Sequence, residues 1–115
     1  MSKELDLENL WKRQIGKLKR HHYLILYWTA QAEVANKKYN ITNVFDDLKA
    51  GGLTRTKQNA VSYVDVLDAL CLIEVKEESN RKNLYITSYG EHALEQQARM
   101  NRYKLEGSSY LGGKK

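Results

Sequence analysis

The glycine pair Gly51–Gly52 places the strongest constraint on the fold, because it separates two short segments that each have the pattern of a helix. Glycine adopts positive φ without strain and is therefore common where a helix ends. The segment before the pair keeps one apolar face, formed by Val44, Phe45 and Leu48. The segment after it keeps another, formed by Ala60, Val61, Val64, Leu67 and Cys71. We therefore expect a helix, a tight turn and a second helix.

Polar residues indicate where these two helices begin. Asn40 or Thr42 can cap the first helix, which we expect to run to about Lys49. Thr54 or Thr56 can cap the second. Either choice leaves a connection of only a few residues, as in a helix-turn-helix unit.

Two short segments after the second helix alternate apolar and polar residues, as half-buried strands do. They are residues 73–77, IEVKE, and residues 83–87, NLYIT. The intervening ESNRK is entirely polar, which is typical of a hairpin loop. We expect a β-hairpin with Asn80, Arg81 and Lys82 at its tip.

Further helices are expected on both sides of this unit. Residues 5–18 carry an apolar stripe at helical spacing, and residues 22–36 predict a more buried helix. Gly16 or the pair His21–His22 can separate these two helices, or they can run on as one. Residues 88–104 predict a last helix with an apolar stripe that includes Leu94, Ala98 and Met100, and the small polar residues of 105–115 predict a flexible tail.

The order helix, helix, short helix, turn, helix, hairpin, helix is that of a winged helix-turn-helix. Residues 41–97 resemble the winged-helix transcriptional regulators of the MarR and PadR types. The resemblance lies in two motifs. LCLI, residues 70–73, follows the end of the second helix, and ITSYG, residues 86–90, lies at the start of the last helix. Cys71 stands where those families usually have glycine.

The order of the elements predicts a mainly α fold with a small β-hairpin wing and with extra N- and C-terminal helices. At 115 residues the chain has the length of one domain. Within it we expect an N-terminal basic amphipathic helix over residues 1–20, the winged helix-turn-helix with its C-terminal helix over residues 21–104, and the tail over residues 105–115.

The helix after the glycine pair has a polar face that suits the DNA major groove. Arginine can bind guanine with two hydrogen bonds, and glutamine or asparagine can do the same with adenine. No acidic residue precedes Asp65 in this helix. The alternative is that this face is simply the solvent-exposed side of a surface helix, which is polar in any soluble protein. We predict a recognition helix whose DNA contacts come from Arg55, Thr56, Lys57, Gln58, Asn59, Ser62 and Tyr63.

The charge of the chain agrees with a polyanionic partner. It carries 19 Lys and Arg against 14 Asp and Glu, a formal net charge of +5. In the hairpin, Asn80, Arg81 and Lys82 form the predicted DNA-binding wing. Glu77 and Glu78 just before them repel phosphate, so only the tip is expected to touch DNA.

A basic cluster accompanies the apolar stripe of the N-terminal helix. Its five bases lie within KRQIGKLKR, residues 12–20. They can be the solvated face of a dimerisation helix, which we favour, a phosphate-binding flank, or the face of a helix on an anionic membrane. The predicted dimerisation residues are Leu7, Leu10, Trp11, Ile15, Leu18, Leu94, Ala98 and Met100.

Other classes of function find little support in the sequence. AGGLTRTK lacks the Gly-Lys-Ser/Thr ending of a phosphate-binding loop, so we expect no enzyme. Three histidines and one cysteine have no metal-ligand spacing, and we expect no metal and no cofactor. Cys71 is expected on the apolar side of its helix as an inert thiol. Without a long apolar run or a secretory signal, we expect no membrane and a cytoplasmic location.

These features together predict sequence-specific binding of double-stranded DNA by a homodimeric transcriptional regulator. Helix-turn-helix proteins usually need two half-sites, because one helix contacts few bases. The alternative is a winged-helix protein-interaction module in a replication or transcription assembly, because the fold alone does not fix the function.

Overall fold

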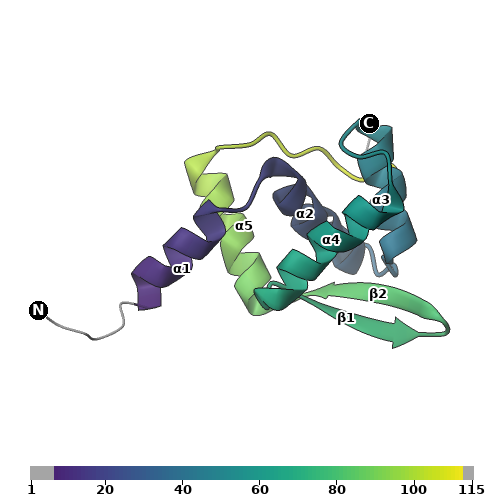
Figure 1. Cartoon of the computed structure of the whole chain (residues 1–115), viewed down its shortest axis with the longest axis horizontal. Helices are drawn as coiled ribbons and strands as arrows, with labels where there is room; N and C mark the ends of the chain where they lie inside the picture. Colours follow the sequence, from purple (N-terminus) through teal and green to yellow (C-terminus); the bar gives the residue numbers. More distant parts are fainter. Residues whose placement is uncertain (1–6, 113–115) are drawn as a thin grey trace, which may run out of the picture.

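The computed structural model describes residues 7–112, and within them it holds five helices and one antiparallel hairpin (Figure 1). The mainly α winged helix-turn-helix predicted from the sequence is confirmed. The ends of the expected first helix and tail, residues 1–6 and 113–115, lie outside the described part. In chain order the elements are α1 (Leu7–Gly16), α2 (Arg20–Val34), α3 (Ile41–Ala50), α4 (Lys57–Ala69), β1 (Ile73–Glu78), β2 (Arg81–Ile86) and α5 (Ser88–Met100).

The helix-turn-helix unit consists of α3, a turn at the glycine pair, and α4. Asn40 is the N-cap of α3, and its Oδ1 accepts a hydrogen bond from the Asn43 backbone N–H at 2.9 Å. Thr56 is the N-cap of α4, and its hydroxyl accepts from the Asn59 N–H at 3.1 Å. Gly52 has φ +74°, which lets the chain turn sharply after α3.

The first two helices are separate, which decides between the two possibilities left open by the sequence. The chain leaves α1 after Gly16 and starts α2 at Arg20. The Lys19 backbone N–H donates to His22 Nδ1 at 2.9 Å, which satisfies one donor at the start of α2. The Tyr23 hydroxyl donates to the Ile15 carbonyl oxygen at 2.9 Å and ties the two helices together.

The core lies around α2, which packs against α4, α5 and β2, while α3 packs against α4 and β2 (Figure 1). Ile25 and Leu26 on α2 are fully buried. Every other helix and both strands contribute apolar side chains to this core, among them Ile15, Val44, Leu48, Val64, Leu67, Ile73, Leu84 and Ala93. The positions of the helix-turn-helix and the hairpin are therefore fixed against one shared core.

The hairpin is tighter than the sequence predicts. Ser79 and Asn80 form a two-residue turn in which both have positive φ, at 52° and 65°. Arg81 pairs with Glu78 in the register, so Arg81 and Lys82 are the first residues of β2 and not part of the tip. The other edge of β2 is also paired, because the Leu84 N–H donates to the Tyr39 carbonyl at 2.7 Å.

Cys71 lies outside the apolar face on which the sequence places it, and that expectation is wrong. Helix α4 ends at Ala69, and Cys71 follows with φ +62° and an exposed side chain. Its N–H bonds to the Asp68 carbonyl, and the Leu72 N–H bonds to the Leu67 carbonyl, both at 2.9 Å. This is the Schellman pattern that glycine usually completes.

The segment after α5 packs onto the protein as far as Leu111, contrary to the expected flexible tail. Trp28 Nε1 donates to the Glu106 carbonyl at 2.7 Å. Ser108 is fully buried, and its backbone N–H donates to Gln31 Oε1 at 3.1 Å. Small polar residues favour disorder only where no partner binds them, and here α2 and α3 supply partners.

Candidate nucleic-acid interface

The N-terminal half of α4 presents a polar surface to solvent. Ala60 and Val64 are buried, whereas Lys57, Gln58, Asn59 and Ser62 are exposed. These four side chains include donors and acceptors and no carboxylate, and the first acidic residue of the helix is Asp65. A helix with this surface can present hydrogen-bonding groups to base edges.

Three of the predicted contact residues have positions that differ from the expected helix face. Arg55 is exposed but lies in the turn before α4, two residues before its first residue, Lys57. The Thr56 hydroxyl is occupied as the helix N-cap. Tyr63 is half-buried, and its ring stacks on His21 of α2 with centroids 4.0 Å apart. Arg55 therefore lies outside α4 itself, and the Tyr63 ring contacts α2.

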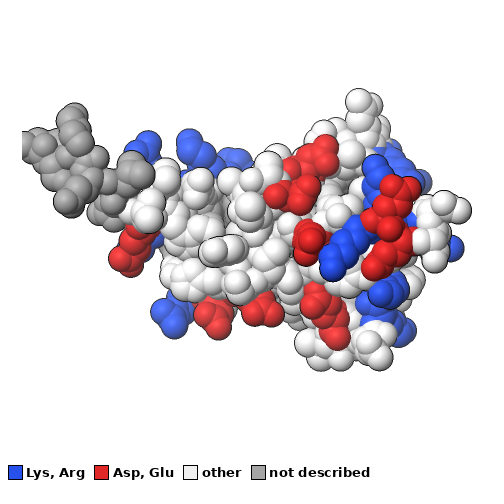
Figure 2. Space-filling model, turned by 90° about the horizontal axis from the view of Figure 1, so that it is seen from below, with Lys and Arg blue, Asp and Glu red and all other residues white. Residues whose placement is uncertain are grey.

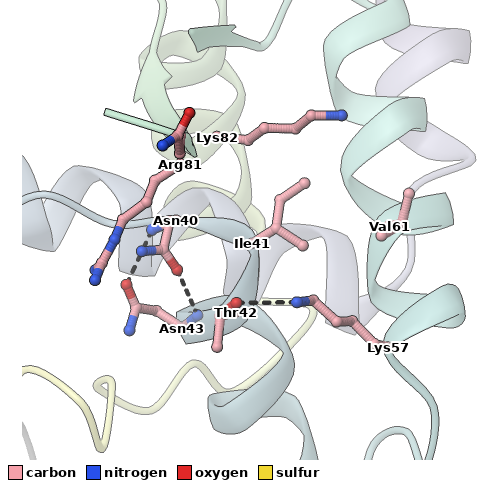
Figure 3. A pocket seen from close by; sticks show the side chains of 9 residues that line it. Asn40, Ile41, Thr42, Asn43, Lys57, Val61, Arg81 and Lys82 are labelled. Atoms are coloured by element: carbon pink, nitrogen blue, oxygen red, sulfur yellow. Dashed lines mark hydrogen bonds between the residues drawn. The ribbon is translucent and has the colours of Figure 1, made fainter. Parts of the chain in front are cut away.

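A groove of about 560 Å³ runs between α4, the start of α3 and the wing (Figure 3). Lys57 Nζ donates to the Thr42 hydroxyl at 3.0 Å across it and links the starts of the two helices. Ile41 and Val61 provide apolar surface. Its remaining lining residues are Asn40, Asn43, Asn80, Arg81 and Lys82. The structure therefore brings the predicted wing residues together with the start of the predicted recognition helix.

The wing end has mixed charges. Figure 2 shows Lys and Arg side chains interspersed with Asp and Glu at the end of the molecule that carries the hairpin. Lys82 is the cross-strand neighbour of Glu77, and Arg81 that of Glu78. Even so, within residues 7–112 neither Arg81 nor Lys82 takes part in an ion pair. Both cations are exposed to solvent.

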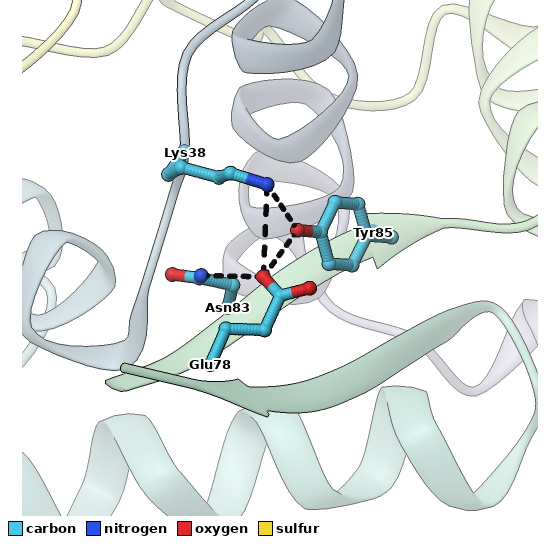
Figure 4. Close-up of polar contacts among 4 residues, drawn as sticks. All are labelled: Lys38, Glu78, Asn83 and Tyr85. Carbon is cyan, nitrogen blue, oxygen red and sulfur yellow. Dashed lines mark hydrogen bonds and ion pairs between the residues drawn. The ribbon is translucent and has the colours of Figure 1, made fainter. Parts of the chain in front are cut away.

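A polar cluster that the sequence did not reveal explains why Glu78 leaves Arg81 unpaired (Figure 4). Glu78 Oε1 accepts hydrogen bonds from the Tyr85 hydroxyl at 2.6 Å and from Asn83 Nδ2 at 2.8 Å. Lys38 Nζ lies 3.6 Å from the same oxygen and donates to the Tyr85 hydroxyl at 2.8 Å. The hydrogen bond from Tyr85 is the main reason why the pKa of Glu78 is lowered.

The predicted dimerisation residues divide into two groups. Ile15 and Leu18 are buried in the core of the single chain, so they cannot touch a partner directly. Trp11 and Leu94 are half-buried. The exposed members are Leu7, Leu10, Ala98 and Met100. Tyr89 of α5, which was not among the predicted residues, is exposed as well, and its ring lies 6.3 Å from that of Trp11.

The described residues hold neither a grouped set of metal ligands nor a membrane-spanning helix. Among residues 7–112, no three His, Cys, Asp or Glu side chains are grouped as a metal ion would require. In the same part of the chain, no helix combines the length and the apolar character needed to span a bilayer.

The shared core, the glycine turn between α3 and α4 and the paired hairpin define a winged helix-turn-helix protein, as the resemblance to the MarR and PadR types predicts. The sequence matches no family model and no curated protein. Solved structures do match. The chain is similar to TubR from Bacillus megaterium pBM400, with a TM-score of 0.62 and 23% identity over 78% of this chain and 97% of that one.

Other similar structures show the same fold at lower identity. AF1382 from Archaeoglobus fulgidus has a TM-score of 0.59 and 13% identity, over 77% of this chain and 92% of its own. A mutant of MepR from S. aureus was solved with a bound oligodeoxyribonucleotide. It has a TM-score of 0.55 and 16% identity, over 86% of this chain and 77% of its own. These likenesses confirm the fold.

Proposed function

We propose that this protein binds double-stranded DNA sequence-specifically, as a dimeric transcriptional regulator. The observation that carries the proposal is the surface of α4. Its first turns expose Lys57, Gln58, Asn59 and Ser62 and hold no acid, while the opposite side is fixed in the core. An α-helix of this kind fits the major groove, where amide side chains can distinguish base pairs.

The groove beside α4 supports a second set of contacts. When α4 enters a major groove, the start of α3 and the wing face the adjoining phosphates. Lys57, Arg81 and Lys82 line this groove. Each lysine or arginine that neutralises a phosphate releases counterions and strengthens binding at low salt. The wing therefore adds affinity, and α4 reads the sequence.

A dimer follows from the exposed apolar residues at the other end of the molecule. Leu7 is 65% exposed, Leu10 46% and Met100 59%. They lie on α1 and at the end of α5, and none of them lines the groove beside α4. Two copies joined there would each present one α4, as two half-sites of an operator require.

A protein-docking module is the second candidate, and the mixed charge of the wing favours it. Glu77 and Glu78 stand beside the two cations of β2, which weakens attraction to a polyanion. A partner protein with alternating charges would fit such a surface. The docking function predicts no duplex binding.

Duplex binding as a function of salt tests the proposal. The full chain is titrated onto a randomised duplex library, and the selected sequences are compared with scrambled duplexes of the same length. Enriched sequences and a steep fall of affinity between about 50 and 200 mM salt support regulation at specific sites. Equal affinity for all duplexes indicates nonspecific coating, and no binding indicates docking.

A further inference from the structure

The wing holds an arginine beside a glutamate without forming the pair that their positions favour. Glu78 and Arg81 flank the two-residue turn and are direct cross-strand partners. Side chains at such positions lie about 5 Å apart at Cβ and readily make ion pairs. Instead, the Glu78 carboxylate binds Tyr85, Asn83 and Lys38 (Figure 4), and Arg81 lines the groove that the start of α3 also lines (Figure 3).

Tyr85 is the central member of this arrangement. Its hydroxyl oxygen accepts from Lys38 Nζ at 2.8 Å. The hydroxyl group in turn donates its hydrogen to Glu78 Oε1, with the two oxygens 2.6 Å apart. Lys38 belongs to the turn between α2 and α3, so the tyrosine connects the wing to the body of the domain and keeps the carboxylate on that side.

We propose that Tyr85, together with Lys38, is a positioning residue that keeps Glu78 off Arg81 and so leaves the Arg81 guanidinium free for a DNA phosphate. The inference rests on the proposed DNA-binding function. Without the tyrosine hydroxyl, the carboxylate turns to its cross-strand arginine and neutralises it. The affinity of the wing for DNA then falls although no DNA-contacting residue has changed.

The test is a set of full-length variants measured against one selected duplex. Tyr85→Phe removes a single oxygen and keeps the ring. We expect it to weaken binding about three- to tenfold in a dimer. Adding Glu78→Gln should restore the affinity, because a neutral amide cannot capture the arginine. In an Arg81→Ala background, Tyr85→Phe should have no further effect. Tyr27→Phe, on a half-buried tyrosine of α2 that lines neither the groove nor the polar cluster, is the matched control and should leave binding unchanged.

Two results would overturn the proposal. A loss in Tyr85→Phe that persists after Glu78→Gln would mean that the hydroxyl acts on structure or on DNA directly. A loss that adds fully to that of Arg81→Ala would mean that the arginine is not the target.

A readout without DNA separates this proposal from the function on which it rests. The NMR signal of Arg81 Nε–Hε should follow the titration of Glu78 in Tyr85→Phe and stay unmoved in the unmodified protein. If no duplex binds but this difference appears, the positioning role stands and the DNA-binding proposal fails. If both proteins give the same Arg81 titration, the positioning role is wrong.

Discussion

The carboxylate of Asp47 on α3 accepts a hydrogen bond from the hydroxyl of Ser108 at 2.5 Å, although the two residues are 61 positions apart. The same carboxylate accepts from the Tyr39 hydroxyl at 2.5 Å and from the Tyr110 backbone N–H at 3.0 Å. Burial, followed by the bond to Asp47, raises the pKa of Tyr39 far above its usual range, so Tyr39 stays a donor. One buried acid thus fastens the C-terminal segment to the helix-turn-helix.

Replacing this acid should destabilise the fold strongly. Asp47→Ala leaves the donors of Tyr39, Ser108 and Tyr110 without their acceptor, and we expect a loss of about 3 kcal/mol in the free energy of unfolding. Asp46→Ala, on the exposed neighbour, is the control and should change it by less than about 0.5 kcal/mol. Urea unfolding followed by tryptophan fluorescence compares the two, and equal losses would contradict the fastening role.

Sequence discrimination should depend on Gln58. Gln58→Ala is expected to cost about 1–3 kcal/mol on a selected duplex and much less on random DNA, because only a base contact distinguishes the two. Asp68→Asn, on the exposed C-terminal half of α4, is the control. Fluorescence anisotropy gives both affinities. Equal losses on both duplexes would assign Gln58 a phosphate contact at most.

The wing should contribute affinity without much specificity. The double change Arg81→Ala, Lys82→Ala removes two exposed cations from the groove. It should weaken all duplexes alike and reduce the slope of log affinity against log salt by roughly 2 to 4 units in a dimer. The double change Arg99→Ala, Lys104→Ala, on two exposed cations outside the groove, is the control for net charge. If the slope does not change, the wing stays off the DNA, and the docking function gains support.

Dimerisation should depend on the exposed part of α1. Leu7→Gln, Leu10→Gln replaces two exposed side chains without touching the core, so the variant should fold and sediment as a monomer. Removing α1 altogether is a poorer test, since Ile15 and Leu18 are core residues. A variant that remains dimeric in analytical ultracentrifugation would move the interface to α5, with Leu94, Ala98 and Met100 as its first candidates.

The start of α2 should make stability depend on pH. Burial, with smaller effects from His21 and Lys19, lowers the pKa of His22 to about 4. Between that value and the ordinary 6.5 the unfolded chain binds more protons, so stability falls as the pH drops through this range. We expect His22 to account for about 1–2 kcal/mol between about pH 7.5 and pH 5.

His22→Asn tests this pH dependence with little change of geometry. Asparagine can still accept from the Lys19 N–H, as Asn43 does from Asn40 at the start of α3. Urea midpoints at the two pH values should differ less in the variant than in the unmodified protein. An equal difference in both would show that other groups cause the change.

The helices were predictable because their apolar residues recur at helical spacing and their ends carry local signals. Asn40 and Gly52 act within a few residues of their own position, so the sequence could narrow the cap of α3 to Asn40 or Thr42 and the turn to the glycine pair. The sequence could not show whether Thr54 or Thr56 is the N-cap of α4, since both have the required hydroxyl. The choice is made by packing, which buries Thr54 and leaves Thr56 at the helix start.

The wing and the C-terminal segment show what local pattern cannot reveal. Arg81 and Lys82 are as compatible with an exposed strand position as with a loop. The sequence therefore predicted a longer loop than the two-residue turn that the structure has. Asp46 and Asp47 are adjacent residues of the same type. Only Asp47 is buried, because it accepts hydrogen bonds from the distant Ser108 and Tyr110. Likewise, the cluster of Lys38 with Glu78 joins residues from separate elements, and no spacing in the sequence indicates it.

The pairing of the hairpin also bears on how the protein behaves when concentrated. Tyr39 covers the outer edge of β2, so within the described residues only β1 keeps an unpaired edge. An open edge can recruit strands from other molecules and start aggregation. In IEVKEE four of the six residues are charged, and three of these are glutamates. Two such edges brought together would repel one another, and the strand is thereby protected from joining its own copies into fibres.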